Sequence, residues 1–208
     1  MLDTISKSDL DSSSKNELNY LINIINDLKK IKEEGNVLYK NNKLEEAKNI
    51  FLKGYNLFQQ ELNKIEKIYS NEDKINELYI LYKKILSKIA KYFYKQEKYK
   101  NSIIYDLKII ELEPKNSKSL VRLFYSYSKL NKCQQAIYYG EIILGFNDDI
   151  KNKYIDISKN INEEKIKLSK IKRSTYIKNL FIFFGSVLII FIAIILFYIF
   201  KNCNYMIY

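Results

Sequence analysis

The side chains in this sequence that could do chemistry are cations, and the chemistry open to them is the binding of anions. The chain has no histidine, which removes the commonest general base and metal ligand. It also has no paired carboxylates, glycine-rich phosphate loop or Cys-X-X-Cys motif to support an enzyme. Lysine and arginine number 35, against 24 acidic residues. We therefore expect a binding protein that is not an enzyme and needs no metal or other cofactor.

The elements that position these cations are expected to be helices. One proline and five glycines in 208 residues leave few turns for a β-rich fold. Apolar residues recur with helical spacing instead, as at Leu81, Ile85, Ile89 and Tyr92. The sequence predicts an all-α protein, preceded by a polar, flexible N-terminal segment over residues 1–13.

A long apolar segment lies near the end of the chain. Residues 180–200 read LFIFFGSVLIIFIAIILFYIF and carry no charge. A helix of that length spans roughly 30 Å at about 1.5 Å per residue, which matches the hydrocarbon core of a bilayer. A buried core helix is the alternative, but such a long apolar run is hard to bury in a domain this small. We expect a transmembrane helix over residues 179–200, with a short lumenal or intermembrane tail over 201–208.

The segment before this span is strongly basic, which favours a cytosolic location for the bulk of the chain. We interpret the charge as a topology signal and as attraction to anionic lipid, so the bilayer is one expected partner. Nucleic acid is not, because no nucleic-acid-binding motif accompanies the charge. The long, very apolar span favours the endoplasmic reticulum slightly over the mitochondrial outer membrane. The basic residues of the flank are Lys165, Lys167, Lys170, Lys172, Arg173 and Lys178.

A repeat runs through the helical part. Small residues near the start of each second helix recur at Ala47, Ser102 and Ala136, and the last two are 34 residues apart. This is the period of the tetratricopeptide repeat (TPR), which these segments resemble. The resemblance implies an α-solenoid in which the two helices of each repeat cross closely at the small residue. We expect a TPR domain over residues 14–149, with about three repeats near 28–69, 76–112 and 117–147.

Three features depart from or extend the standard repeat. Ala47 and Ser102 are 55 residues apart, so we expect an extended helix and a polar loop around residues 59–74. Asp106 and Gly140 occupy positions that usually carry an aromatic residue, which predicts looser packing in the second and third repeats. A helix over residues 150–178 is expected to cover the exposed edge of the last repeat and lead into the membrane.

The start of the first repeat, Lys32-Glu33-Glu34-Gly35-Asn36, resembles the carboxylate-clamp subfamily of TPR domains. That subfamily occurs in chaperone cofactors and large FK506-binding immunophilins, where it grips the C-terminal Glu-Glu-Val-Asp of cytosolic heat-shock chaperones. One position departs from the pattern, because Lys88 stands where the subfamily has asparagine; partner choice or peptide register can change as a result. Solvated charges that coincide with the pattern are the alternative. The resemblance places the peptide-binding residues at Lys32, Asn36, Lys88, Lys118 and Arg122.

Together these features predict a membrane-anchored TPR adaptor, or co-chaperone, that recruits a cytosolic chaperone to an organelle surface. One alternative is an organelle-division or membrane-scaffold adaptor resembling tail-anchored mitochondrial fission factors, which have a shorter bundle and no clamp. Another is an immunophilin-related protein without isomerase activity, because the segment ahead of Lys32 is too short for the strand-rich isomerase domain.

Overall fold

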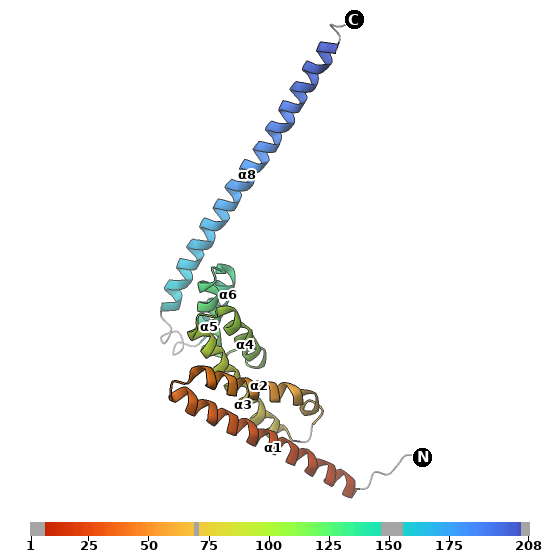
Figure 1. Cartoon of the computed structure of the whole chain (residues 1–208), viewed down its shortest axis with the longest axis vertical. Coiled ribbons are helices and arrows are strands. Elements are labelled where there is room, and N and C mark those ends of the chain that lie inside the picture. Colours follow the sequence, from red (N-terminus) through yellow and green to blue (C-terminus); the bar gives the residue numbers. More distant parts are fainter. Residues whose placement is uncertain (1–6, 69–70, 147–155, 205–208) are drawn as a thin grey trace, which may run out of the picture.

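The computed structural model describes residues 7–68, 71–146 and 156–204, and within them it contains seven helices and no strand. The all-α prediction is confirmed. Figure 1 shows the shorter helices packed together and one long helix, α8, leaving them. The helices are α1 (Lys7–Lys40), α2 (Leu44–Ile65), α3 (Glu72–Lys95), α4 (Tyr99–Leu112), α5 (Ser117–Lys129), α6 (Cys133–Leu144) and α8 (Asp156–Asn204).

Three helix pairs share one turn geometry. The turns after α1, α3 and α5 are each three residues long, and the middle residue has a positive φ: 60° at Asn42, 56° at Glu97 and 56° at Asn131. A backbone N–H then closes each turn onto the preceding helix. These bonds run from Lys43 to the carbonyl oxygen of Leu38 (3.0 Å), from Lys98 to that of Phe93 (2.9 Å), and from Lys132 to that of Tyr127 (2.9 Å).

The small residues that defined the repeat occupy equivalent places in the three pairs. Ala47, Ser102 and Ala136 each lie five residues after the left-handed turn residue, and each is fully buried. The hydroxyl of Ser102 donates to the carbonyl oxygen of Ala90 at 3.0 Å, so the two helices of this pair approach within hydrogen-bonding distance. The repeat register read from the sequence is therefore present in the fold.

Large and small residues alternate between the first and second helices of the pairs. In the first pair a side chain at Gly35 would collide with the ring of Phe51. In the third pair the sizes are exchanged, because a side chain at Gly140 would lie 3.0 Å from Phe124 and 2.7 Å from Ile161 of α8. The expectation of loose packing at Gly140 is therefore wrong, since Ile161 fills the space that an aromatic residue would occupy.

The core has two parts. One lies mainly among α1, α2 and α3, where Leu21 and Leu28 of α1 are fully buried, and it includes Ile109 of α4. Helix α1 begins at Lys7, earlier than expected. Residues 1–6 of the expected flexible segment lie outside the described residues. The second part is formed by α5, α6 and the start of α8, where Ile157 and Ile161 are buried against the last helix pair.

The 55-residue spacing between Ala47 and Ser102 arises because α2 is long and runs to Ile65. A short connection then leads to α3. From Asp156 onward the expected covering helix and the expected span form a single helix, α8. The boundary expected at residues 149–150 and the last residues of the expected tail lie outside the described residues.

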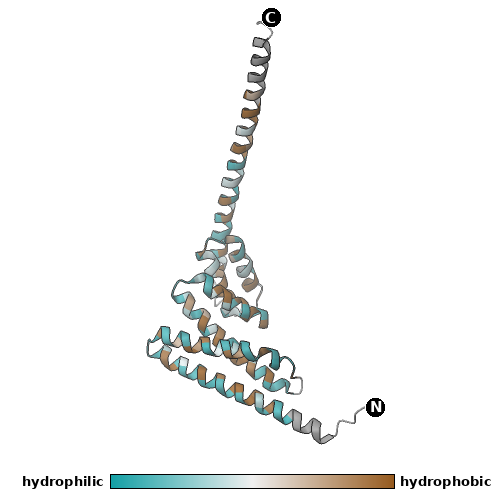
Figure 2. Cartoon of the chain, turned by 45° about the vertical axis from the view of Figure 1, so that its right-hand side comes forward, coloured by the Kyte–Doolittle hydropathy of each residue, from teal (hydrophilic) through white to brown (hydrophobic). Residues whose placement is uncertain are grey.

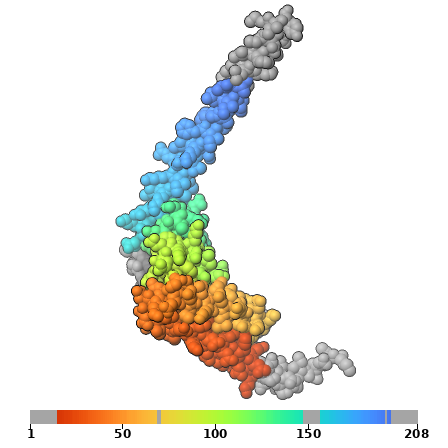
Figure 3. Space-filling view, viewed as in Figure 1, coloured from red at the N-terminus to blue at the C-terminus, as the bar shows by residue number. Residues whose placement is uncertain are grey.

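Among the described residues, α8 is the one helix long and apolar enough to cross a membrane, judged by length and composition alone. Figure 2 shows hydrophobic residues along the coloured part of α8 beyond the helix pairs. Figure 3 shows the coloured part of α8 projecting beyond the helix pairs, and no residue of its apolar window is buried.

Candidate peptide-binding face

The predicted binding residues all lie on the first helices of the three pairs. These helices are adjacent, because α3 packs against both α1 and α5. We call their shared surface the first-helix face. It carries Lys32 and Asn36 on α1, Lys88 on α3, and Lys118 and Arg122 on α5.

Lys32, Asn36 and Lys88 come together where α1 passes α3. Lys32 forms an ion pair with Glu33 at 2.9 Å, and its side chain is only 22% exposed. The hydrogen bond from Lys32, with a further one from Asn36, lowers the pKa of the Glu33 carboxyl. Burial lowers the pKa of the Lys88 amine, with a further contribution from Lys91, and Glu33 and Lys32 are also within electrostatic reach of it. The Oδ1 atom of Asn36 is buried and has no hydrogen-bond partner within the described residues.

Arg122 has an internal partner that the sequence did not reveal. Its Nε lies 3.1 Å from both carboxylate oxygens of Asp106, and its Nη2 lies 2.5 Å from Oδ1. Asp106 is fully buried, and the Ser102 hydroxyl, which donates to Ala90, lies 3.3 Å from its Oδ2. Burial raises the pKa of the Asp106 carboxyl, and the Arg122 guanidinium opposes that rise. The aromatic position that Asp106 occupies is thus filled by an ion pair.

The start of α5 fixes where Arg122 and Lys118 project. Asn116 caps this helix, because its side chain accepts a hydrogen bond from the backbone N–H of Ser119 at 3.1 Å. Arg122 also reaches α3, where its Nη2 lies 3.4 Å from the hydroxyl of Ser87. Lys118 is exposed and forms no ion pair with any residue that the structure describes. The structure therefore groups Lys32, Asn36 and Lys88, ties Arg122 to the same α3 surface, and leaves Lys118 apart.

Further cations join this face around Tyr39 of α1. The ammonium groups of Lys88, Lys91 and Lys95 lie 5.8, 5.7 and 5.2 Å from the centre of its ring. The ring packs against the core, as expected for a tyrosine at an apolar repeat position, but its buried hydroxyl has no partner within the described residues. Sequence reasoning missed Lys91 and Lys95. Their spacing along one face of α3 was the available signal, but lysine is so common here that it carried little weight.

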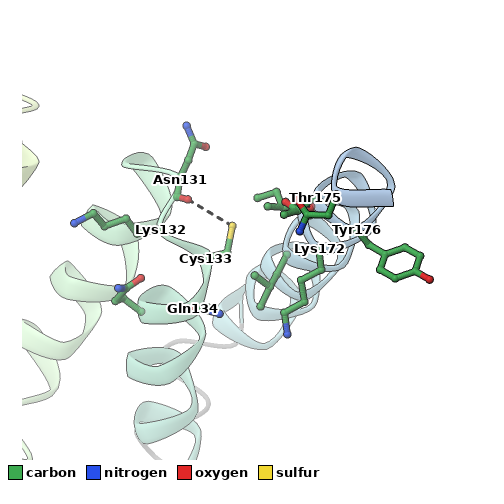
Figure 4. Close-up of a pocket in the computed structure, with 11 residues that line it drawn as sticks. Asn131, Lys132, Cys133, Gln134, Lys172, Thr175 and Tyr176 are labelled. Atoms are coloured by element: carbon green, nitrogen blue, oxygen red, sulfur yellow. Dashed lines mark hydrogen bonds between the residues drawn. The ribbon is translucent and has the colours of Figure 1, made fainter. Parts of the chain in front are cut away.

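A cleft of about 580 Å³ lies between the start of α6 and the middle of α8 (Figure 4). Cys133 lies at its wall, and burial raises the pKa of its thiol. The side chains of Lys132 and Tyr176 point away from the space between the helices (Figure 4). The cleft therefore presents no convergent set of cations. The described residues also contain no cluster of three or more side chains suited to a metal ion.

The paired helices, their common turn and the buried small residues define a helical-repeat protein of the TPR type. Among solved structures, the C-terminal TPR-containing domain of a Plasmodium falciparum protein described as FK506-binding is similar, with a TM-score of 0.54 and 19% sequence identity. The match covers 68% of this chain and 93% of that domain. At this identity the likeness shows the fold alone, and a TPR fold is a scaffold for protein interactions. Neither a protein-family model nor a curated protein matches the sequence.

Proposed function

We propose that this chain is a membrane-anchored TPR adaptor that binds the acidic C-terminal peptide of a cytosolic heat-shock chaperone and holds the chaperone at an organelle surface. The observation that supports this most is the grouping of Lys32, Asn36 and Lys88 from two different helices on the first-helix face. Cations and an amide that converge from separate helices suit a peptide terminus, which offers carboxylate oxygens and backbone N–H groups together.

Each residue has a distinct role in this proposal. The terminal carboxylate accepts hydrogen bonds from Lys32 and Lys88, and in doing so it replaces Glu33 as the partner of Lys32. Asn36 Oδ1, which is buried without a partner, accepts a peptide N–H. Lys118 adds an exposed charge further along the face. Arg122 uses Nε and Nη2 for Asp106, so only the donors of Nη1 are left for a peptide.

The anchor in this proposal is the apolar part of α8. The basic segment before it keeps the helix pairs on the cytosolic side, and the span's length and apolarity favour the endoplasmic reticulum over the mitochondrial outer membrane. The adaptor would then lie directly above the bilayer, because α8 packs against α6 at its start and no residue of its apolar window is buried.

The test is a binding titration of the full chain, reconstituted in phosphatidylcholine nanodiscs, with a fluorescent peptide that ends in Glu-Glu-Val-Asp. We expect a dissociation constant in the micromolar range, about −8 kcal/mol at 1 μM. Amidation of the peptide terminus removes the charge being gripped and should abolish binding. Lys32→Gln and Lys88→Gln should each weaken binding, while Lys53→Gln on the exposed side of α2 should not. Equal binding of the free-acid and amidated peptides would reject the proposal.

The membrane-scaffold adaptor is a second candidate, and the Arg122–Asp106 ion pair favours it. A clamp that depends on its arginine loses much of its strength when a buried carboxylate already holds that guanidinium. If neither peptide form binds, this candidate takes first place. An immunophilin-related adaptor without isomerase activity has the same fold and differs from the first proposal only in ancestry.

A further inference from the structure

Three lysines of α3 gather around one tyrosine without a counterion. Lys88, Lys91 and Lys95 lie on one face of the helix, and all three ammonium groups are within 5.8 Å of the centre of the Tyr39 ring. None of the three forms an ion pair with a carboxylate among the described residues. Glu33, the acidic group within electrostatic reach of Lys88, is already paired with Lys32.

This arrangement leaves donors unused. Like charges this close repel one another, and that repulsion contributes to the lowered pKa of Lys88. The hydroxyl of Tyr39 is buried beside the cluster without a hydrogen-bond partner in the described part of the chain. Three ammonium groups and one phenol therefore form a set of donors with no acceptor, and an anion would relieve both the repulsion and the unmet hydrogen bond.

The number of charges indicates which anion fits. A carboxylate carries one negative charge and would leave the cluster strongly positive. A phosphorylated side chain carries about −1.5 to −2 charges at neutral pH and three acceptor oxygens, which matches the two ammonium groups of Lys91 and Lys95 far better, with Lys88 at the edge of the cluster.

We propose that the cluster of Tyr39, Lys91 and Lys95, with Lys88 at its edge, binds a phosphorylated serine or threonine side chain of the peptide whose terminal carboxylate lies at Lys32 and Lys88. This inference rests on the proposed function, because it assigns a second contact to the same peptide. Lys88 and Lys95 are seven residues apart, about 10 Å along the helix. An extended peptide covers that distance in about three residues at roughly 3.3 Å each. The phosphorylated residue should therefore stand about three or four positions before the terminus.

The test compares peptides that end in Ser-Glu-Glu-Val-Asp, with the serine free, phosphorylated or replaced by glutamate, titrated onto the full chain in phosphatidylcholine nanodiscs. We expect phosphorylation to strengthen binding about tenfold, and glutamate to strengthen it much less. Lys91→Gln/Lys95→Gln and Tyr39→Phe should each remove most of the phosphate gain, which is measured for every variant as the ratio of its affinities for the phosphorylated and the free-serine peptides. The matched control Lys53→Gln/Lys100→Gln removes the same charge from exposed positions on α2 and α4 and should keep the gain.

Each outcome decides between defined alternatives. Equal affinity for the free and phosphorylated serine overturns the inference, as does a phosphate gain that the Lys91/Lys95 and the control variants lose equally. The proposed function fails separately, because it predicts that the unphosphorylated free-acid peptide binds and its amidated form does not. If the amidated phosphopeptide binds through Lys91 and Lys95 while the terminal carboxylate makes no difference, the phosphate site stands and the carboxylate site is rejected.

Discussion

Removal of Arg122 should destabilise the fold, and the reason is Asp106 rather than any ligand. Asp106 is fully buried, and the Arg122 side chain is 13% exposed, so the charge of Asp106 is compensated inside the protein. Deletion of one partner of such a pair leaves an uncompensated buried charge, at a cost of about 3–5 kcal/mol. A domain of this size loses about 2–4 °C of melting temperature per kcal/mol, so Arg122→Ala should melt about 6–20 °C lower.

The pH dependence separates this cause from a simple loss of packing. Burial already raises the pKa of Asp106, and without Arg122 only the smaller contributions of the Ser119 and Ser102 hydroxyls oppose that rise. The Asp106 carboxyl of the folded variant therefore binds a proton more tightly than the same carboxyl in the unfolded chain, and its contribution to stability increases as the pH falls. The loss of stability of Arg122→Ala relative to wild type should be largest at neutral pH and should become smaller as the pH falls. Arg122→Ala/Asp106→Asn, which carries no buried charge, should show a small deficit at every pH.

The assay is thermal unfolding followed by far-ultraviolet circular dichroism, on residues 7–178 so that the apolar part of α8 is absent. The apolar replacement Asp106→Leu/Arg122→Met should recover stability to within about 1–2 kcal/mol of wild type, because well-packed apolar side chains often replace a buried ion pair without loss. This account of the pair would be refuted if Arg122→Ala were as stable as wild type, or if its loss of stability did not change with pH.

Three other results are expected. Ala47→Leu should cost about 1–3 kcal/mol in denaturant unfolding, because it forces methylenes between closely crossing helices. Lys53→Leu on the exposed side of the same helix should cost little. A larger loss of stability for Lys53→Leu than for Ala47→Leu would reject the repeat register. Glu97→Asn should stabilise by up to about 1 kcal/mol, since asparagine tolerates a positive φ better than glutamate; Glu97→Ala, measured by the same unfolding midpoint, should give no gain. A glycosylation acceptor appended after Tyr208 should be modified in microsomes while protease added outside digests the helix pairs; protection of the helix pairs would reject a cytosolic orientation.

The sequence predicted the fold well at positions where each repeat places the same steric demand on a residue. Ala47, Ser102 and Ala136 identify the closest approach of paired helices, because a large residue at any of them would hold the helices apart. The filling of the gap at Gly140 by Ile161 could not be predicted in the same way. It depends on how α8 returns to the last pair, and that path is a tertiary feature with no local sequence signature.

The candidate site was less predictable than the fold, because its chemistry depends on which charges are neutralised internally. Arg122 is an arginine at a clamp position whether or not a carboxylate holds it. The partner that decides this, Asp106, lies on α4 and had been recognised only as a missing aromatic residue. The ring of Tyr39 packs against the core, as its apolar repeat position suggests, but the role of its hydroxyl depends on three lysines from another helix.

The internal pairs also indicate where a ligand must bind. Glu33, Lys88 and Arg122 occupy equivalent positions in the three repeats, since their spacing matches that of Ala47, Ser102 and Ala136. In the first repeat this position is an acid that neutralises Lys32, and in the third it is a base neutralised by Asp106. Only in the middle repeat is the charge left without an ion-pair partner among the described residues, and there two further lysines add to it. Uncompensated positive charge is therefore concentrated on α3, and an acidic peptide should be centred on that helix rather than on α5.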